Sequence, residues 1–295
     1  NFSDDEITNA VIGICKKNKI KKSCYIRPFY FVGDYGINLH VTEKAPTNVA
    51  IFAFPLGDLF SKNGITAGVV SWRKFSDMST PPQAKMGGNY LNSIIATQEA
   101  KRNGFDEAIL LDHNGNVSEA PGENIFIVRN GQLITPSLAS SALEGITRDA
   151  IIKIAKDLDI DMIERDVTRS ELIISEEIFL TGTAAEITPI IKMDSKQIGT
   201  GKPGDITKKM MEIVVNMSLY EVQTAPSFWS SSSSLFILNF LFFIKSCLFN
   251  VCHIPILFLE KYSHGNFSPG SFFLNTDISE CPKKFWVLIL YFFTK

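Results

Sequence analysis

A single lysine, Lys85, lies beside two glycines and a tyrosine in the stretch AKMGGNYL, Ala84–Leu91, where a helix is predicted to begin. An amine becomes nucleophilic when it is desolvated or lies near another cation, because either change lowers its pKa. Lysines that form Schiff bases require such an environment. The alternative is a solvated surface lysine at an ordinary loop-to-helix junction, and this stretch alone does not decide between the two.

Two carboxylates, Glu119 and Glu123, lie four residues apart in a turn that contains Pro121 and Gly122, between apolar segments. A buried carboxylate needs a partner. A pyridinium nitrogen would be a suitable partner, because the carboxylate keeps such a ring protonated and electron-withdrawing. The alternative is a pair of turn carboxylates in solvent or in salt bridges.

Two further segments are candidate anion sites. Gly145 and Thr147 lie at a predicted helix N-terminus, where exposed N–H groups and the helix dipole favour phosphate. The segment Thr181–Glu186 offers small residues and hydroxyls at a strand end, where the backbone can approach a ligand closely. Each segment is alternatively a plain helix cap or turn.

The elements predicted around these residues are short strands and helices in mixed order. This order predicts the α+β class. Ser3 and Glu6 form a capping-box pattern that opens a helix toward Asn18. The helix Gly88–Arg102 has Leu91, Ile94 and Ile95 on one face. Further helices are predicted over 145–158, 170–174 and 205–220, and strands over 23–32, 48–55, 66–75, 107–112, 124–129, 132–134, 162–167, 177–180 and 187–192. Asn114-Gly115 and Asn130-Gly131 predict tight turns between strands.

The 295 residues carry a net charge of −2, which argues against nucleic acid or an anionic membrane surface as the partner. The cysteines show neither metal-ligand nor disulfide-framework spacing, which favours a reducing, cytoplasmic compartment: Cys15, Cys24, Cys247, Cys252 and Cys281. The histidines match no catalytic or metal-binding pattern: His40, His113, His253 and His264.

The last quarter of the chain differs in composition from the rest. The segment 224–295 begins with a serine run and holds 13 of the chain's 23 phenylalanines, so we interpret it as a non-homologous tail. A membrane span is the alternative, because Leu235–Leu259 is long enough, but Lys245, His253 and Pro255 interrupt it.

In order and spacing, the segments around Lys85, Glu119, Asn124–Phe126, Leu133–Thr135 and Leu143–Arg148 resemble the class IV (fold-type-IV) aminotransferases, which use pyridoxal phosphate. The resemblance covers about residues 4–213. Three motifs favour the branched-chain amino acid aminotransferases over the D-amino-acid aminotransferases and the aminodeoxychorismate lyases: AKMGGNYL, YIRP (Tyr25–Pro28) and GTAAEITP (Gly182–Pro189). Pro121 is a minor departure, because the family pattern prefers a smaller residue there.

The resemblance implies a role for each matching residue. Lys85 would hold the cofactor covalently and move a proton, Glu119 would bind the pyridine nitrogen, and Tyr90 would hydrogen-bond the ring 3-hydroxyl oxygen. The segment Gly145–Thr147 and Thr183 would hold the phosphate.

The resemblance also implies a substrate site and a partner. Tyr25, with the backbone at Thr183 and Ala184, would receive the substrate carboxylate, and Arg27 would order that wall. Leu56 and Leu59 would contact an aliphatic side chain. The expected substrates are leucine, isoleucine and valine with 2-oxo acids, and the expected partner is a second copy of the chain.

The implied fold is D-amino-acid aminotransferase-like, with a small α/β domain and a large domain that contains a pseudo-barrel. We expect residues 1–54 to be a remnant of the small domain, 55–66 an interdomain loop, 67–223 the cofactor-binding domain and 224–295 the tail. In the family a further stretch precedes the position of Asn1 and supplies a phosphate-binding arginine, so the chain is expected to be N-terminally truncated. The alternatives are a non-catalytic fragment, a membrane-associated remnant, or another class IV transaminase acting on D-amino acids or amines.

Overall fold

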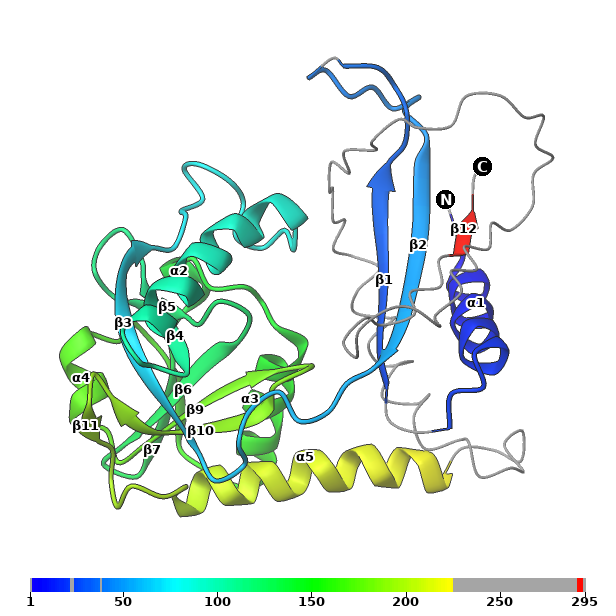
Figure 1. Ribbon diagram of the computed structural model, residues 1–295. Helices are drawn as coiled ribbons and strands as arrows, with labels where there is room; N and C mark the ends of the chain where they lie inside the picture. The colour runs from blue at the N-terminus through cyan, green and yellow to red at the C-terminus, as the bar shows by residue number, and fades with distance from the viewer. Residues whose placement is uncertain (1, 22–23, 38, 225–290, 294–295) are drawn as a thin grey trace, which may run out of the picture. The chain divides into compact units, whose positions relative to one another are not determined.

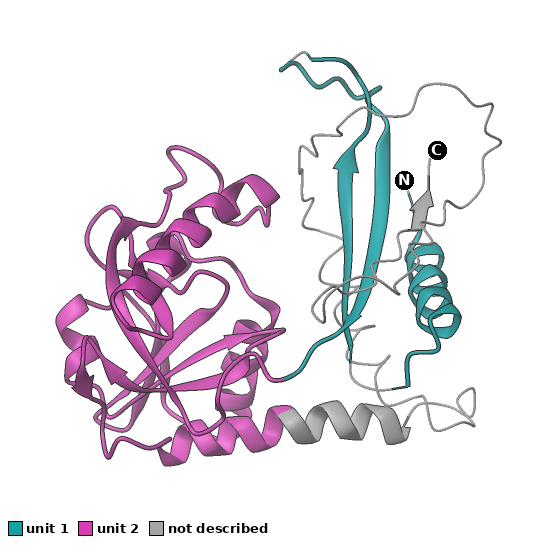
Figure 2. Ribbon diagram, in the orientation of Figure 1, with its two compact units in different colours: residues 1–57, 226–295 teal, residues 58–225 magenta. Residues whose placement is uncertain are grey.

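The computed structural model describes residues 2–21, 24–37, 39–224 and 291–293. The chain divides into two compact units, 1–57 with 226–295, and 58–225 (Figure 2). The tail predicted over 224–295 lies outside the described residues except for Thr224 and the short strand Tyr291–Phe293.

In its described residues the first unit consists of one helix and a small antiparallel sheet (Figure 1). Helix α1, Asp4–Lys17, begins with the predicted capping box between Ser3 and Glu6. Strands β1, Cys24–Val32, and β2, Thr47–Pro55, pair antiparallel, and β12, Tyr291–Phe293, pairs with the other edge of β2. One cluster of buried apolar side chains joins α1 to the sheet: Ile7, Val11, Ile14, Ile26, Val49 and Ile51.

The second unit contains a nine-stranded mixed sheet with the order β5-β4-β3-β10-β9-β6-β7-β8, and β11 pairs with β10. The strands are β3 Ile65–Arg73, β4 Glu107–Leu111, β5 Val117–Glu119, β6 Asn124–Arg129, β7 Gln132–Thr135, β8 Met162–Glu164, β9 Glu177–Gly182, β10 Glu186–Met193 and β11 Lys196–Gln197. Parallel pairing joins β3 to both β4 and β10, and β7 to β8, whereas the other pairs are antiparallel. This mixture of parallel and antiparallel pairs confirms the α+β prediction.

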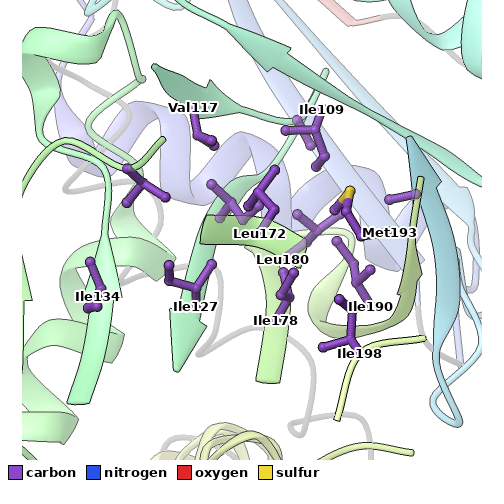
Figure 3. Close-up of a cluster of buried hydrophobic side chains, with 14 of the residues drawn as sticks. Ile109, Val117, Ile127, Ile134, Leu172, Ile178, Leu180, Ile190, Met193 and Ile198 are labelled. Atoms are coloured by element: carbon purple, nitrogen blue, oxygen red, sulfur yellow. The ribbon is translucent and has the colours of Figure 1, made fainter. Parts of the chain in front are cut away.

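Helices lie on this sheet and complete two cores. The helical segments are η1 Gly87–Asn89, α2 Tyr90–Arg102, η2 Leu138–Ser140, α3 Ile146–Asp157, α4 Arg169–Ile173 and α5 Asp205–Thr224. One core gathers side chains such as Ile109, Ile127 and Leu180 from neighbouring strands (Figure 3). A second core contains Phe126 and Phe179 together with residues of α3 and α5. None of the helices in the described part of the chain combines the length and the apolar character that a membrane crossing requires.

Helix α2 turns its small residues inward and its large apolar residues outward. Ala96 and Ala100 are fully buried against β3 and β4, in a cluster with Leu110. Leu91 is 66% exposed and Ile94 is 53% exposed. The apolar face that the sequence predicted for this helix is therefore directed away from the core of its own unit.

Candidate active site

A pocket in the second unit gathers three of the predicted site residues, Lys85, Tyr90 and Glu119. Its walls come from the end of β3, the loop before α2, the turn between β5 and β6, and the segment that precedes α3. The lining residues are Lys74, Phe75, Pro82, Ala84, Lys85, Met86, Asn89, Tyr90, Ser93, Glu119, Pro121, Gly122, Glu123, Asn124 and Leu143.

Lys85 is half-buried in the loop between β3 and α2. Gln83 ties this loop to the segment before α3, since its Nε2 donates to the Ala142 carbonyl at 2.9 Å and its Oε1 accepts from the Glu144 N–H at 2.9 Å. Among the residues that the structure describes, no carboxylate forms an ion pair with the Lys85 ammonium. The loop therefore presents the amine to the pocket with no carboxylate paired to it in the described part of the chain.

Glu119 is the last residue of β5 and is buried, with 4% of its surface exposed. The prediction that Glu119 lies in a turn is wrong, because the turn is Ala120–Glu123, closed by a hydrogen bond from the Ala120 N–H to the Glu123 carbonyl. The Glu119 carboxylate accepts from Asn124 Nδ2 and from the Leu143 N–H, both at 2.9 Å and both at Oε2. Its other oxygen, Oε1, lies 2.5 Å from Lys74 Nζ.

Asn124, the first residue of β6, connects the parts of the site. Its Nδ2 donates to Glu119 Oε2 and also to the Leu143 carbonyl, at 2.8 Å, while its backbone is paired with Thr181 of β9. A side chain on Gly145 would place its Cβ 2.1 Å from Asn124 Oδ1, so only glycine fits at this position. The side-chain amide of Asn124 thus links the Glu119 carboxylate to the segment that precedes α3.

The N-terminus of α3 has the features predicted for an anion site. Gly145 is the N-cap, no side chain caps the helix, and the first intrahelical bond runs from Asp149 to the Gly145 carbonyl. The N–H groups of Ile146 and Thr147 belong to the first turn of α3. Backbone N–H groups in the first turn of a helix have no carbonyl partner within that helix. They are available to an anion.

Thr183 and Ala184 lie in the hairpin between β9 and β10, which confirms the predicted strand end. Gly182 of this hairpin lies against Gly122, whose carbonyl oxygen would be 3.3 Å from an added Cβ. Neither Gly145–Thr147 nor Thr183–Ala184 lines the pocket. The Gly145 N–H donates to the carbonyl of the pocket residue Leu143 at 2.8 Å, and Gly182, which precedes Thr183, packs against the pocket residue Gly122.

The remaining predicted residues lie in or near the first unit. Arg27 Nη2 donates to Tyr25 Oη at 3.2 Å, and the Arg27 guanidinium lies 5.1 Å from the centre of the Tyr25 ring. Leu56 is half-buried in the first unit, whereas Leu59 belongs to the second unit and is 47% exposed.

Two further carboxyl groups, Glu107 and Glu123, are buried in this part of the second unit. Burial raises the pKa of Glu123 to about 8, and the neighbouring Glu107 and Glu119 add to the increase. Burial likewise raises the pKa of Glu107, and the Ala108 N–H opposes it. Of the three carboxyl groups, Glu119 is the one that has a lysine counter-ion among the described residues.

The raised pKa of Glu123 predicts a pH-dependent stability. The folded chain holds this proton up to about pH 8, whereas the unfolded chain releases it near pH 4.5. Because the folded state binds more protons in this interval, rising pH destabilises it. Between pH 6 and pH 8 the group should lower the free energy of unfolding by about 2 kcal/mol.

Glu123→Gln should remove this dependence, which urea unfolding of both proteins at the two pH values would measure. Glu144→Gln, an exposed carboxyl near the same site, is the matched control and should behave like the unsubstituted chain. Equal pH slopes for Glu123→Gln and the unsubstituted chain would contradict the prediction.

Sequence reasoning gave no individual role to several residues that build the site: Lys74, Gln83, Asn124 and Leu143. Asn124 was part of the recognised motif, so its position was known without its function. Lys74 and Gln83 carried no local signal, because their partners lie 45 and 59 or more residues away in the chain.

Comparison with known proteins agrees with this geometry. Residues 1–193 match the family described as Amino-transferase class IV. The chain is 45% identical over 214 residues to the protein named branched-chain-amino-acid aminotransferase of Escherichia coli strain K12, which covers 71% of this chain and 69% of the relative.

Solved structures give the same result. The branched-chain aminotransferase of Thermoproteus uzoniensis, solved with norvaline, is 44% identical with a TM-score of 0.70, over 73% of this chain and 71% of that one. The branched-chain amino acid aminotransferase of Thermobaculum terrenum, solved in its PLP form, is 36% identical with a TM-score of 0.68, over 73% and 71%. These values confirm the predicted fold.

Proposed function

This chain belongs to the class IV aminotransferases, and on that premise we propose that it transfers amino groups between branched-chain L-amino acids and 2-oxoglutarate. The amino acids are leucine, isoleucine and valine, and the cofactor is pyridoxal phosphate. The observation that carries the proposal is the single pocket that combines the amine of Lys85 with the buried carboxylate of Glu119. The names of the E. coli and T. uzoniensis relatives support the branched-chain assignment.

The residues present fit the chemical groups of this cofactor. An aldehyde needs an amine, and Lys85 offers one without an ion-paired carboxylate among the described residues. A pyridinium nitrogen needs a carboxylate, and Glu119 is buried and oriented by three donors. A phosphate needs N–H donors, and α3 begins beside the pocket residues Asn124 and Leu143 with no side-chain cap.

When bound, pyridoxal phosphate supplies an electron sink for the charge left on a substrate Cα after its proton is removed. Lys85 would hold the cofactor through its amine, and the same amine would take the proton from the substrate Cα. A base already held at the reacting carbon gains the advantage of proximity. Glu119 would accept the hydrogen bond from the ring N–H and so favour the protonated ring.

The other assignments complete the proposal. Tyr90 hydrogen-bonds the ring 3-hydroxyl oxygen, and the phosphate binds at Ile146, Thr147 and Thr183. Tyr25 receives the substrate carboxylate. Arg27 orients the Tyr25 ring, a role that the hydrogen bond from Arg27 to Tyr25 Oη supports.

The backbone of Thr183 and Ala184 also binds the substrate carboxylate. Leu56 and Leu59 contact the aliphatic side chain of the substrate.

The proposal includes a homodimer and a cytoplasmic location. The outward face of α2, with Leu91 and Ile94, supports a second copy as the partner, because exposed apolar side chains that lie together mark interaction surfaces. The cytoplasmic location is proposed because the five cysteines show no disulfide-framework spacing, which favours a reducing compartment.

Titration of the full chain with pyridoxal phosphate tests the function. We expect a saturable visible absorbance band, which L-leucine removes and 2-oxoglutarate restores. D-alanine, the control substrate, should change the band far more slowly.

Absence of the band would favour a non-catalytic chain. Faster conversion of D-alanine than of L-leucine would favour a D-amino-acid transaminase.

A further inference from the structure

Lys74 lies directly after β3 and is a second lysine in the pocket. Its N–H donates to the Leu111 carbonyl at 2.8 Å, and its side chain is 7% exposed. Its Nζ lies 2.5 Å from Glu119 Oε1 and 4.7 Å from the centre of the Phe75 ring. Among the ion pairs of the described residues, this is the one in which both side chains are almost completely buried.

The charges around Glu119 explain why a buried cation is needed there. Glu107, Glu119 and Glu123 are all buried in this region, and burial disfavours the ionised form of a carboxyl group. Glu123, which lacks a cation among the described residues, has its pKa raised to about 8. Glu119 differs in its contacts, because Lys74 Nζ lies 2.5 Å from its carboxylate and both side chains are buried.

The geometry around Glu119 leaves room for one more donor. A carboxylate offers about four lone-pair sites. Asn124 and the Leu143 N–H occupy Oε2, while Oε1 has Lys74 as its partner among the described residues. Both oxygens are thus held in place, and Oε1 retains one acceptor site.

We propose that Lys74 is the positioning residue of Glu119, whose carboxylate it pairs with and orients so that Oε1 can accept the ring N–H of the cofactor. This inference rests on the proposed function, because the ring is that of pyridoxal phosphate. Lys74 itself acts through Glu119 and is not an attachment point, since its ammonium is bound in the ion pair.

The dissociation constant of pyridoxal phosphate, measured by absorbance, tests the proposal in four proteins: the unsubstituted chain, Lys74→Met, Glu119→Gln and the double variant. Lys74→Met should weaken cofactor binding by about tenfold or more, as expected for the loss of one charge-assisted hydrogen bond. Lys74→Arg should restore most of the affinity, because it retains the charge. In the Glu119→Gln background, Lys74→Met should change the affinity by less than about threefold, because no anion remains for the lysine to hold.

Lys153→Met is the matched control, because Lys153 also pairs with a carboxylate, Asp149, but both side chains are exposed. It should leave the affinity unchanged. An unchanged affinity for the cofactor in Lys74→Met would overturn the proposal. So would a double variant whose loss of affinity equals the sum of the losses, in free energy, of the two single variants, because a purely structural lysine acts independently of Glu119.

Circular dichroism and urea unfolding of the same proteins without cofactor provide a second readout. If Lys74→Met fails to fold, the double variant, which buries no unpaired charge, should fold and allow the comparison with Glu119→Gln. If the unsubstituted chain binds no cofactor, the proposed function fails, whereas the ion pair is still judged by unfolding. If the changes in the free energy of unfolding caused by Lys74→Met and Glu119→Gln are not additive in the double variant, the two residues interact. Additive changes overturn the proposed ion pair.

Discussion

Lys85→Ala is expected to lower kcat/KM for L-leucine by at least about a thousandfold, because it removes both the attachment of the cofactor and the base that moves the Cα proton. Lys85→Arg should lose nearly as much activity, since a guanidinium retains the charge but does not act as a nucleophile at neutral pH. The measurement is the initial rate of glutamate formation from leucine and 2-oxoglutarate.

Borohydride reduction followed by peptide mapping identifies the attached lysine. We expect the phosphopyridoxyl label on the Lys85 peptide, although Lys74 lines the same pocket, because the Lys74 Nζ is engaged in the buried ion pair with Glu119, whereas no such pair holds Lys85 among the described residues. Lys153→Ala, on the exposed face of α3, is the control and should retain full activity. A label on Lys74, or normal turnover by Lys85→Ala, would contradict the assignment.

Phe126→Ala is expected to lower the free energy of unfolding by about 3–5 kcal/mol, the range found for removal of a fully buried aromatic side chain. Phe126 and Phe179 are register partners on β6 and β9, with ring centres 5.1 Å apart and planes inclined by 5°. Both side chains are completely buried. Truncation therefore removes a large apolar surface and a stacking contact at the same time.

The effect should reach the site, because Phe126 lies two residues after Asn124 on β6. Urea unfolding followed by circular dichroism gives the stability, and cofactor titration gives the effect on binding. Phe126→Leu should lose less than Phe126→Ala, and Ile174→Ala, at a 56% exposed position, should lose little. A loss below about 1 kcal/mol for Phe126→Ala would show that the core closes around the missing ring.

The elements that the sequence predicted correctly are those whose signals are local. The capping box of Ser3 and Glu6 needs only one helical turn, and it is present at the start of α1. Asn130 and Gly131 both have positive φ angles, 51° and 73°, as a two-residue hairpin between β6 and β7 requires. Gly145 is the N-cap of α3, where a helix N-terminus was predicted.

The features that the sequence did not reveal, one strand and the buried face of one predicted helix, depend on distant partners. β5 has three residues, too few for a periodic pattern, and it exists because β4 pairs with it. Helix α2 buries alanines and exposes Leu91 and Ile94, a choice that its own periodicity could not reveal. In each case, the neighbouring strand or surface decides what the segment does.

The sequence by itself determined the family and was enough to propose Lys85 as the reactive amine, because the motif residues and their order can be read along the chain without knowledge of the tertiary structure. The sequence did not determine which of the two carboxyl groups has hydrogen-bond and ion-pair partners. Glu119 and Glu123 have the same side chain four residues apart, yet Glu119 has Lys74, Asn124 and the Leu143 N–H as partners, while Glu123 is buried with a raised pKa. Only the tertiary structure decided this difference, because Lys74 and the Leu143 N–H, which hold Glu119, come from segments 45 and 24 residues away in the chain.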